Sequence, residues 1–516
     1  MLTCRWHAQY NKSTCCKRIV VDFSERGRLF VSKTALYLAY FCAYSLVLII
    51  IGKGSLRGGN SLRAYFICDR AVNLPMSVCT FTDTWVSAIT ILSLTGSVYE
   101  AGISTLIYSV IPWFLGAFCL ALMAKRIYHN DVITVPEFFR VRYGSKALQC
   151  VYGIIFMLVY TLYLVAQYKG FGLVAAEMFD IPFPVAVGMI YLFIIYTTFG
   201  GYRSVVRTDF FNLVLLVVSL GVICAMILSR TGGFSELLTQ ADRISGLAHS
   251  GIQEPTPPGG LFDMFSARYT PLSSISMFCG WGLGLAANPQ YLVRLLGARD
   301  DRTARNTVIV SLVLLTAIIF MLVTIGLGMR VLVPSLTVPE NTDGIFIRLI
   351  NNELYSPWSG FFLFSVIGAC ISTANSQLLL IASSFSYDIV ASVTPKPLRE
   401  SQVVWLGRAA ILVCGTMSML LTLDPPTFTL SYGGDIWGIV SILLFPPLYG
   451  TLLTKHITRR GVWACVIAGT ISIALFYPPY QKGVIQAHPA MYGVILSTAA
   501  MFLVSALERR KGGRKE

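Results

Sequence analysis

The chain has 516 residues, of which 55% are hydrophobic and 13% are charged, and its mean hydropathy is +0.68. Soluble globular domains carry about 25% charged residues, so this composition excludes an ordinary soluble protein and indicates an integral membrane protein. The formal net charge is +15, but the basic residues gather in short loops between apolar runs. That pattern sets membrane orientation and argues against nucleic-acid binding.

The chain opens with a polar, basic stretch over residues 1–32, which we expect to be an external tail. A metal site built with His7 is conceivable there, but disorder is the stronger expectation. The thirteen cysteines of the chain show no zinc-ligand spacing and are expected to be small core residues. We therefore expect no cofactor.

About thirteen apolar runs follow, with lengths that suit membrane-spanning helices. They cover residues 33–52, 74–101, 103–124, 148–175, 182–201, 209–229, 272–292, 307–332, 358–388, 404–423, 428–453, 462–479 and 490–507. The sequence therefore predicts an all-α integral membrane protein with about 13 transmembrane helices.

The basic residues lie in alternate loops between these runs. They fall within residues 125–146, 203–207, 294–305, 396–399, 455–460 and 509–515. Because basic loops face the cytoplasm, we expect a multi-pass protein of the plasma or inner membrane with a cytoplasmic C-terminus and an external N-terminus. The loops near 230–271 and 333–357 are then external, and the basic tail 1–32 breaks the rule.

Two runs carry signs of a broken helix. The second places an acid, Asp83, and several hydroxyls in mid-membrane, and the seventh contains Gly280, Gly282 and Gly284 before Asn288-Pro289. Interrupted helices at matching places in two halves indicate an inverted-repeat transporter, because irregular backbone at that depth is tolerated only beside protein or a cavity. The alternative is two unrelated kinked helices.

The ninth run carries hydroxyls on one helix face. Ser372, Thr373 and Ser376 are one, three and four residues apart, and Ala369 shares their face. Hydroxyls with a backbone carbonyl form a suitable oxygen shell for a small hard cation. The alternative is that the hydroxyls bond carbonyls of their own helix and serve packing.

Several stretches together resemble the sodium:solute symporter family, most closely its pantothenate and proline branches. They are residues 65–70, 134–144, 200–209, 288–300 and 368–388, in the family's order and spacing. In the stretch 200–209 the paired glycines release the fifth helix, and Thr208 or Asp209 is expected to cap the sixth.

The resemblance implies a leucine-transporter-like fold with a 5+5 inverted repeat, whose first and sixth core helices are broken. Residues 73–453 would form the ten-helix transport core. Residues 33–72 would form the first flanking helix and its loop, and residues 454–516 two flanking helices with a short basic cytoplasmic tail.

The resemblance also implies Na⁺-driven uptake of a small solute by alternating access. Its ion site, carried onto this chain, consists of the carbonyls of Asp83, Val86 and Ala369 and the hydroxyls of Ser372 and Thr373. Oxygen ligands with few formal charges suit a monovalent ion better than Ca²⁺. Na⁺ is then the only metal, and we expect neither catalytic residues nor an enzyme.

Three residues depart from the family's pattern. Asn375 stands where many relatives have Asp. Asp83 stands where a small residue is usual, and its carboxylate either adds charge to Na⁺ binding, couples H⁺, or caps unwound backbone; we expect ion coupling. Lys169, in the fourth run, either pairs with a substrate carboxylate or snorkels to the external surface, and we expect snorkelling.

The solute is expected near mid-membrane between the broken helices. The lining candidates are Trp85, Thr90, Gln167 and Trp281. A small organic anion or zwitterion is expected, with pantothenate or another monocarboxylate first and proline second. A proton-coupled or sensor-like member of the same fold is a further alternative. The expected partners are the solute, Na⁺ and the lipid bilayer, without nucleic acid or an obligate protein partner.

Overall fold

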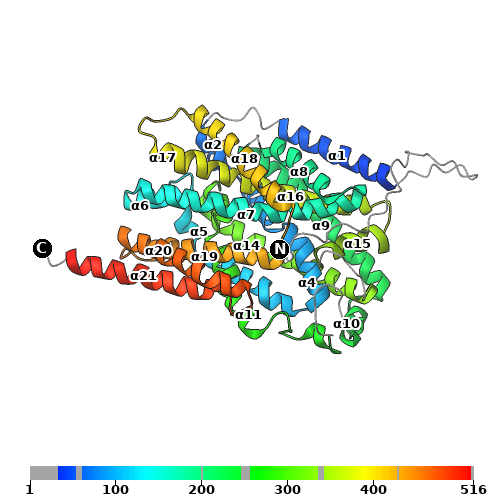
Figure 1. Cartoon of the computed structure of the whole chain (residues 1–516). Coiled ribbons are helices and arrows are strands. Elements are labelled where there is room, and N and C mark those ends of the chain that lie inside the picture. The colour runs from blue at the N-terminus through cyan, green and yellow to red at the C-terminus, as the bar shows by residue number, and fades with distance from the viewer. Residues whose placement is uncertain are drawn as a thin grey trace, which may run out of the picture.

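The computed structural model describes residues 33–53, 61–198, 201–245, 256–334, 342–426 and 429–512. These residues form helices joined by loops, and among them the only β-type pairing is one bridge between Val72 and Ala298. The predicted tail over residues 1–32 lies outside the described residues. Most of the long helices run side by side along one direction, and the C-terminus emerges at one end of them (Figure 1).

Within the described residues, ten helices are long and apolar enough to cross a membrane, and one bent pair raises the number to eleven. The ten are α1 (Lys33–Lys53), α5 (Ile111–Tyr128), α7 (Lys146–Phe179), α9 (Gly201–Thr231), α14 (Asp301–Leu332), α16 (Ser359–Ser383), α18 (Glu400–Thr422), α19 (Thr429–Leu453), α20 (Arg459–Gln481) and α21 (Pro489–Gly512). The bent pair is α3 (Leu74–Trp85) and α4 (Leu94–Ala101).

The remaining two predicted runs fall on shorter helices. They are α8 (Phe183–Thr198), and α11 (Pro271–Met277) with α12 (Leu283–Ala287). Each of the predicted apolar runs thus coincides with a helix or with consecutive short helices. Further short helices are α2 (Leu62–Ile67), α6 (Val135–Tyr143), α10 (Phe234–Arg243), α13 (Pro289–Leu296), α15 (Ile345–Arg348) and α17 (Ala391–Val393).

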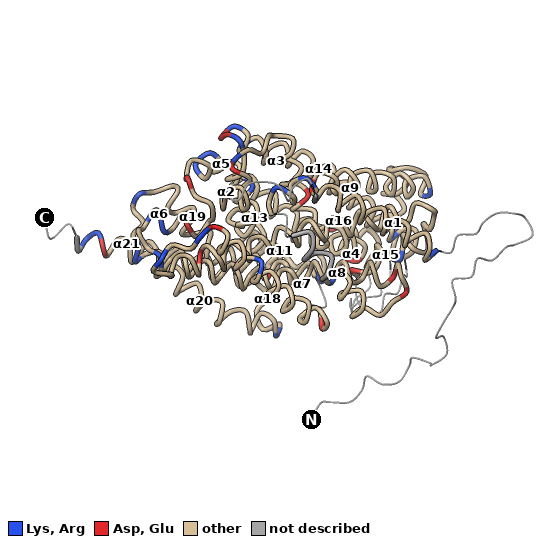
Figure 2. The backbone as a smooth tube through the Cα atoms, turned by 90° about the horizontal axis from the view of Figure 1, so that it is seen from above, with Lys and Arg blue, Asp and Glu red and all other residues tan. Residues whose placement is uncertain are grey.

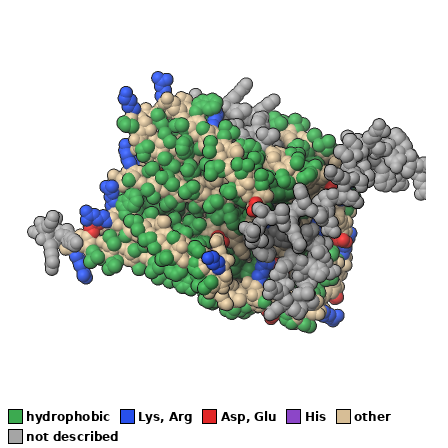
Figure 3. Space-filling model, in the orientation of Figure 1, with side chains coloured by type: hydrophobic (Ala, Val, Ile, Leu, Met, Phe, Trp, Pro, Cys, Tyr) green, Lys and Arg blue, Asp and Glu red, His purple; other side chains and the backbone are tan. Residues whose placement is uncertain are grey.

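The outside of the bundle carries an apolar belt. Large side chains such as Phe118, Val313 and Leu503 are exposed on it. Figure 3 shows this belt between the two ends of the molecule, with Lys and Arg gathered at the end from which the C-terminus emerges. Figure 2 shows the same end from above, again rich in Lys and Arg. An exposed apolar belt with charge at its edges is the surface of a multi-pass membrane protein.

The first core helix is broken, as predicted. Asn73 caps the start of α3 by accepting a hydrogen bond from the Met76 N–H, and α3 ends at Trp85. Val86 adopts an extended conformation, and the helix resumes at Ile89 in a π-helical turn, η2 (Ile89–Ser93), that leads into α4. The two halves are bent by 59°.

The sixth core helix is also broken, but after the glycines rather than at them. A π-helical turn, η5 (Phe278–Gly282), carries α11 into α12, and the chain becomes extended only at Asn288. Asn288 then caps α13 by accepting from the Gln290 N–H. Pro289 follows at the first helical position, where its missing N–H costs nothing. The glycines instead allow close packing.

Gly284 illustrates this packing, and its replacement by alanine should lower the melting temperature of the purified protein. A Cβ at this position would lie 2.5 Å from the Trp437 carbonyl oxygen, so α12 and α19 would have to move apart. Overpacking of this kind costs about 1–3 kcal/mol. The matched control is Gly188→Ala on α8, where a Cβ meets nothing within 4 Å. Equal melting temperatures for the two variants would contradict the packing role.

The helix α16 lies at the centre of the bundle. All of its residues except Phe361 are buried, and it packs against α3, α7, α9 and α18. The helix α9 beside it begins at Gly201, whose φ of +70° favours glycine. Thr208 and Asp209 therefore lie about two turns inside α9, and the prediction that either caps it is wrong. The division of the chain into core and flanking segments stays a prediction.

Candidate functional site

The break after α3 faces the hydroxyl-bearing stretch of α16. The Thr373 hydroxyl lies 3.4 Å from the carbonyl oxygen of Thr84, in the last turn of α3. Ala369, Ser372 and Thr373 are all buried. The structure thus brings the predicted ion-site residues of α16 next to the predicted residues of the broken helix.

Polar oxygens at this meeting point lack partners. Neither carboxylate oxygen of Asp83 accepts a hydrogen bond of good geometry from a described residue, and the hydroxyls of Thr84 and Ser372 are also without one. The Ser372 hydroxyl nevertheless lies within hydrogen-bonding reach of the Asp83 and Asp209 carboxylates. Buried oxygens are normally hydrogen-bonded, so a group of unpartnered ones fits the shell of a small cation. The alternative in which Asp83 caps unwound backbone has no support among the described residues.

Next to Asp83 lies a second buried acid, Asp209 of α9, with an arginine. The Thr80 hydroxyl donates to Asp209 Oδ2 at 2.5 Å, and Arg294 Nη2 lies 3.6 Å from the same oxygen. Arg294 also donates to the Thr80 carbonyl at 3.0 Å and to the Ser376 hydroxyl at 2.6 Å. The arginine of α13 therefore joins α3, α9 and α16.

The sequence interpretation missed this network. Arg294 was assigned to a cytoplasmic loop because it follows the seventh apolar run, yet its side chain is 2% exposed. For Asp209 the sequence predicts a capping role instead, because it follows the paired glycines at the start of the sixth run. For Arg294 the available signal is its place just after the interruption at Asn288-Pro289, and no such signal marks Asp209. Asp83, Asp209 and Arg294 together carry a formal charge of −1, so one negative charge of this trio is not balanced within it.

The predicted lining residues lie on both sides of the break. Gln167 Oε1 accepts from the Ala88 N–H at 3.3 Å, which ties α7 to the break. The Thr90 hydroxyl donates its proton to the Trp85 carbonyl at 2.8 Å, within the same broken helix. Trp85 Nε1, Trp281 Nε1 and Gln167 Nε2 donate to no described residue.

Trp85 and Trp281 belong to one chain of aromatic rings. Trp85 lies 5.5 Å from Tyr291, Tyr291 lies 5.9 Å from Trp437, and Trp437 lies 4.9 Å from Trp281, measured between ring centroids. Tyr291 and Trp437 were not predicted, because nothing in their sequence context distinguishes them from packing aromatics. The chain links α3, α13, α19 and the turn η5, so it spans both broken helices.

The snorkelling interpretation of Lys169 is wrong. Its side chain is buried, and its ammonium lies 2.7 Å from Asp343 Oδ2. It also donates to the Thr429 hydroxyl at 3.0 Å and to the Pro426 carbonyl at 2.8 Å.

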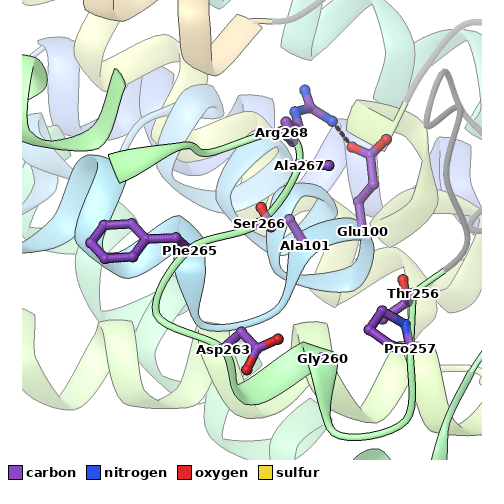
Figure 4. Close-up of a pocket in the computed structure, with 10 residues that line it drawn as sticks. All are labelled: Glu100, Ala101, Thr256, Pro257, Gly260, Asp263, Phe265, Ser266, Ala267 and Arg268. Carbon is purple, nitrogen blue, oxygen red and sulfur yellow. Dashed lines mark ion pairs between the residues drawn. The ribbon is translucent and has the colours of Figure 1, made fainter. Parts of the chain in front are cut away.

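A cavity of about 300 Å³ lies at the end of α4. It is lined by Glu100, Ala101, Thr256, Pro257, Gly260, Asp263, Phe265, Ser266, Ala267 and Arg268. Figure 4 shows the Glu100 carboxylate pointing toward the Arg268 guanidinium, with which it forms an ion pair. None of the predicted site residues lines this cavity.

The profile of the sodium:solute symporter family matches residues 65–501. The chain belongs to this family. The symporter is 24% identical over 496 residues to a sodium/proline symporter of Staphylococcus aureus strain JH9, and the match covers 91% of this chain and 92% of that one. Curated sodium/proline symporters of other strains of the species match equally well.

Solved structures share the fold of the symporter. One, the substrate-bound outward-open state of a Na⁺-coupled sialic acid symporter, has a TM-score of 0.74 at 20% identity, and the match covers 92% of this chain and 98% of that one. Another, the nucleobase-cation-symport transporter Mhp1 in a closed conformation with bromovinylhydantoin, has a TM-score of 0.52 at 12% identity. It covers 86% of this chain and 95% of that one. The leucine-transporter-like fold predicted from the sequence is thereby confirmed.

Proposed function

We propose that this symporter uses a Na⁺ gradient to drive the uptake of a small carboxylate-bearing solute by alternating access. The observation that carries the proposal is the group of unpartnered buried oxygens where the break after α3 meets α16. Membership of a sodium:solute symporter family supports Na⁺ as the ion that binds beside these oxygens. Transport, rather than catalysis, is then the activity, and no cofactor takes part.

The ion shell in this proposal consists of three carbonyls and two hydroxyls. The carbonyls are those of Asp83, Val86 and Ala369, and the hydroxyls are those of Ser372 and Thr373. These residues lie on two elements that pack together, α16 and the broken end of α3, so Na⁺ binding would hold α3 against α16. Loss of Na⁺ would release that contact, which is how ion binding would be linked to the exposure of the site.

The solute in this proposal lies between the broken helices beside Trp85, Thr90, Gln167 and Trp281. Three unpartnered N–H donors in this set favour a solute rich in acceptor atoms, such as a carboxylate. Pantothenate or another monocarboxylate satisfies this chemistry, and so does proline. The similarity to sodium/proline symporters makes proline the second candidate, to be tested alongside pantothenate.

The membrane in this proposal is the plasma or inner membrane, with an external N-terminus and a cytoplasmic C-terminus. The gathering of Lys and Arg at the end of the molecule that bears the C-terminus supports this orientation (Figure 3).

Reconstituted vesicles test the function directly. The purified symporter should accumulate labelled pantothenate or labelled L-proline against a concentration gradient when Na⁺ is high outside. Replacing external Na⁺ with choline should abolish accumulation, and an imposed proton gradient alone should not restore it. Accumulation that is independent of Na⁺ would refute Na⁺ coupling, and equilibration without accumulation would indicate a channel instead.

Thr373→Ala should raise the Na⁺ concentration needed for half-maximal uptake by a factor of about five to ten. The variant removes one of the two proposed hydroxyl ligands, and a hydrogen-bonding or ligating contact of this kind is worth about 1–1.5 kcal/mol. The matched control is Thr307→Ala on α14, whose hydroxyl is buried but donates to the Thr303 carbonyl of its own helix at 2.8 Å. The control should keep the Na⁺ affinity of the unaltered protein. If Thr373→Ala keeps it too, Thr373 is not a ligand.

A further inference from the structure

Lys169 lies beside the proposed solute site, on the stretch of α7 that packs against the break. Two residues before it, Gln167 accepts from the Ala88 N–H, and one residue after it, a Cβ on Gly170 would lie 2.4 Å from the Ala88 Cβ. The start of α19, which holds Thr429, also reaches this region, because a Cβ on Gly433 would meet Ile89 and Trp281. Lys169 therefore borders the residues expected to hold the solute.

Its carboxylate partner comes from a separate element, the short turn η6 (Thr342–Gly344) between α14 and α15. This turn is pressed onto α4, since a Cβ on Gly96 would lie only 2.3 Å from the Thr342 carbonyl oxygen. Asp343 reaches inward from the turn and also accepts from the Thr429 hydroxyl at 2.5 Å. Asp343 thus reaches Lys169 only while η6 is seated on α4.

The ion pair is buried on both sides, with 3% of the Lys169 side chain and 4% of the Asp343 side chain exposed. An ammonium at this depth is costly without a counter-charge. If η6 lifts from α4 and takes Asp343 away, Lys169 on α7, the Thr429 hydroxyl at the start of α19 and the Pro426 carbonyl in the loop before α19 stay behind. Lys169 and Thr429 are then two donors in position to bind a carboxylate, because both bind the carboxylate of Asp343 in this structure.

We propose that Lys169 receives the carboxylate of the incoming solute on the external route, and that Asp343 displaces it when η6 reseats. The exchange passes the solute toward the break and restores the ion pair behind it. Lys169 is then a residue that selects solutes bearing a carboxylate. This inference rests on the proposed function, because it requires a transported carboxylate.

The first test removes the ion pair without leaving a buried lone charge. In reconstituted vesicles, the double variant Lys169→Gln with Asp343→Asn should raise the KM for labelled pantothenate or labelled L-proline about tenfold or more, the effect of losing a charged hydrogen bond. Its Na⁺ dependence should stay unchanged. Asp343→Asn alone keeps the lysine and loses the competing carboxylate, so the KM should stay the same or fall while the maximal rate falls. The control Lys33→Gln removes an external lysine that donates to the Asn351 carbonyl and should change neither value.

The charge-reversed pair Lys169→Asp with Asp343→Lys separates selection from stability. If the ion pair is only structural, the reversed pair should restore both the KM and the maximal rate. The proposal instead expects the KM for the carboxylate to stay high, and recovery of the KM would overturn it. An unchanged KM in the neutral double variant would also overturn it while leaving Na⁺-driven uptake intact. If the unaltered symporter accumulates neither solute, the proposed function fails, and this inference fails with it.

Discussion

Exchanging Arg294 for methionine should deplete the membrane of folded symporter. The guanidinium lies beside Asp209 and donates to the Thr80 carbonyl and the Ser376 hydroxyl. Its loss therefore leaves the buried Asp209 carboxylate without its counter-charge and removes contacts of α13 with α3, α9 and α16. Breaking a buried pair by removing one partner costs about 3–5 kcal/mol, a large part of the stability of most proteins. The amount of monodisperse protein after detergent extraction, and its melting temperature, would measure the loss.

Two further variants test whether the loss comes from the uncompensated charge of Asp209. Arg299→Met removes an arginine whose side chain is 73% exposed and should leave both the yield and the melting temperature nearly unchanged. Adding Asp209→Asn to Arg294→Met should recover part of the loss, because the stranded charge is then gone. A stable, abundant Arg294→Met protein would show that Asp209 is compensated in another way.

Asp83→Asn should raise the Na⁺ concentration for half-maximal uptake about tenfold or more. Arg294 lies beside Asp209 and balances one of the two neighbouring acids, and a cation bound beside Asp83 would hold that carboxyl in its ionised form and be balanced by it. A single charge acting on an ion at contact distance in a buried site contributes at least about 1.4 kcal/mol, which is a factor of ten in affinity. Na⁺ titrations of uptake into vesicles at a fixed solute concentration would measure the change.

The matched control is Asp131→Asn, which neutralises an exposed acid that pairs with Arg63 outside the bundle core. It should keep the original Na⁺ dependence. The same titrations repeated at several pH values distinguish Na⁺ from H⁺ coupling, because a coupled proton would make uptake by the unaltered protein, but not by Asp83→Asn, respond to pH without Na⁺. An unaltered Na⁺ dependence in Asp83→Asn would remove the carboxylate from the ion site.

The helices and their breaks were predictable because they depend on local chemistry. Runs of apolar residues long enough to span a bilayer identify the helices. An acid within such a run, such as Asp83 in the last turn of α3, or a pair such as Asn288-Pro289 marks the neighbourhood of a break. The hydroxyl face of α16 follows from helical periodicity alone. The glycines near 280 were a weaker guide, since a glycine that permits close packing and one that permits a break look alike in a sequence.

The ion pairs were not predictable in the same way, because they join distant parts of the chain. Lys169 and Asp343 are 174 residues apart, and the sequence around either residue does not indicate which residue it pairs with. Periodicity placed Lys169 in a span, and the cost of a buried charge then favoured snorkelling. Arg294 posed the opposite problem, since its position after an apolar run resembles a loop, and only the packing of α13 against α3 and α16 buries it.

The enclosure of α16 has a consequence for how the bilayer influences the symporter. A helix with no face on the apolar belt is insulated from lipid thickness and composition, so an ion affinity set between α16 and the break should be the same in short-chain and long-chain lipids. Helices that border the belt, such as α14 and α18, must slide against lipid when the molecule changes shape. Bilayer thickness would therefore change the rate of the transport cycle and leave the Na⁺ affinity unchanged.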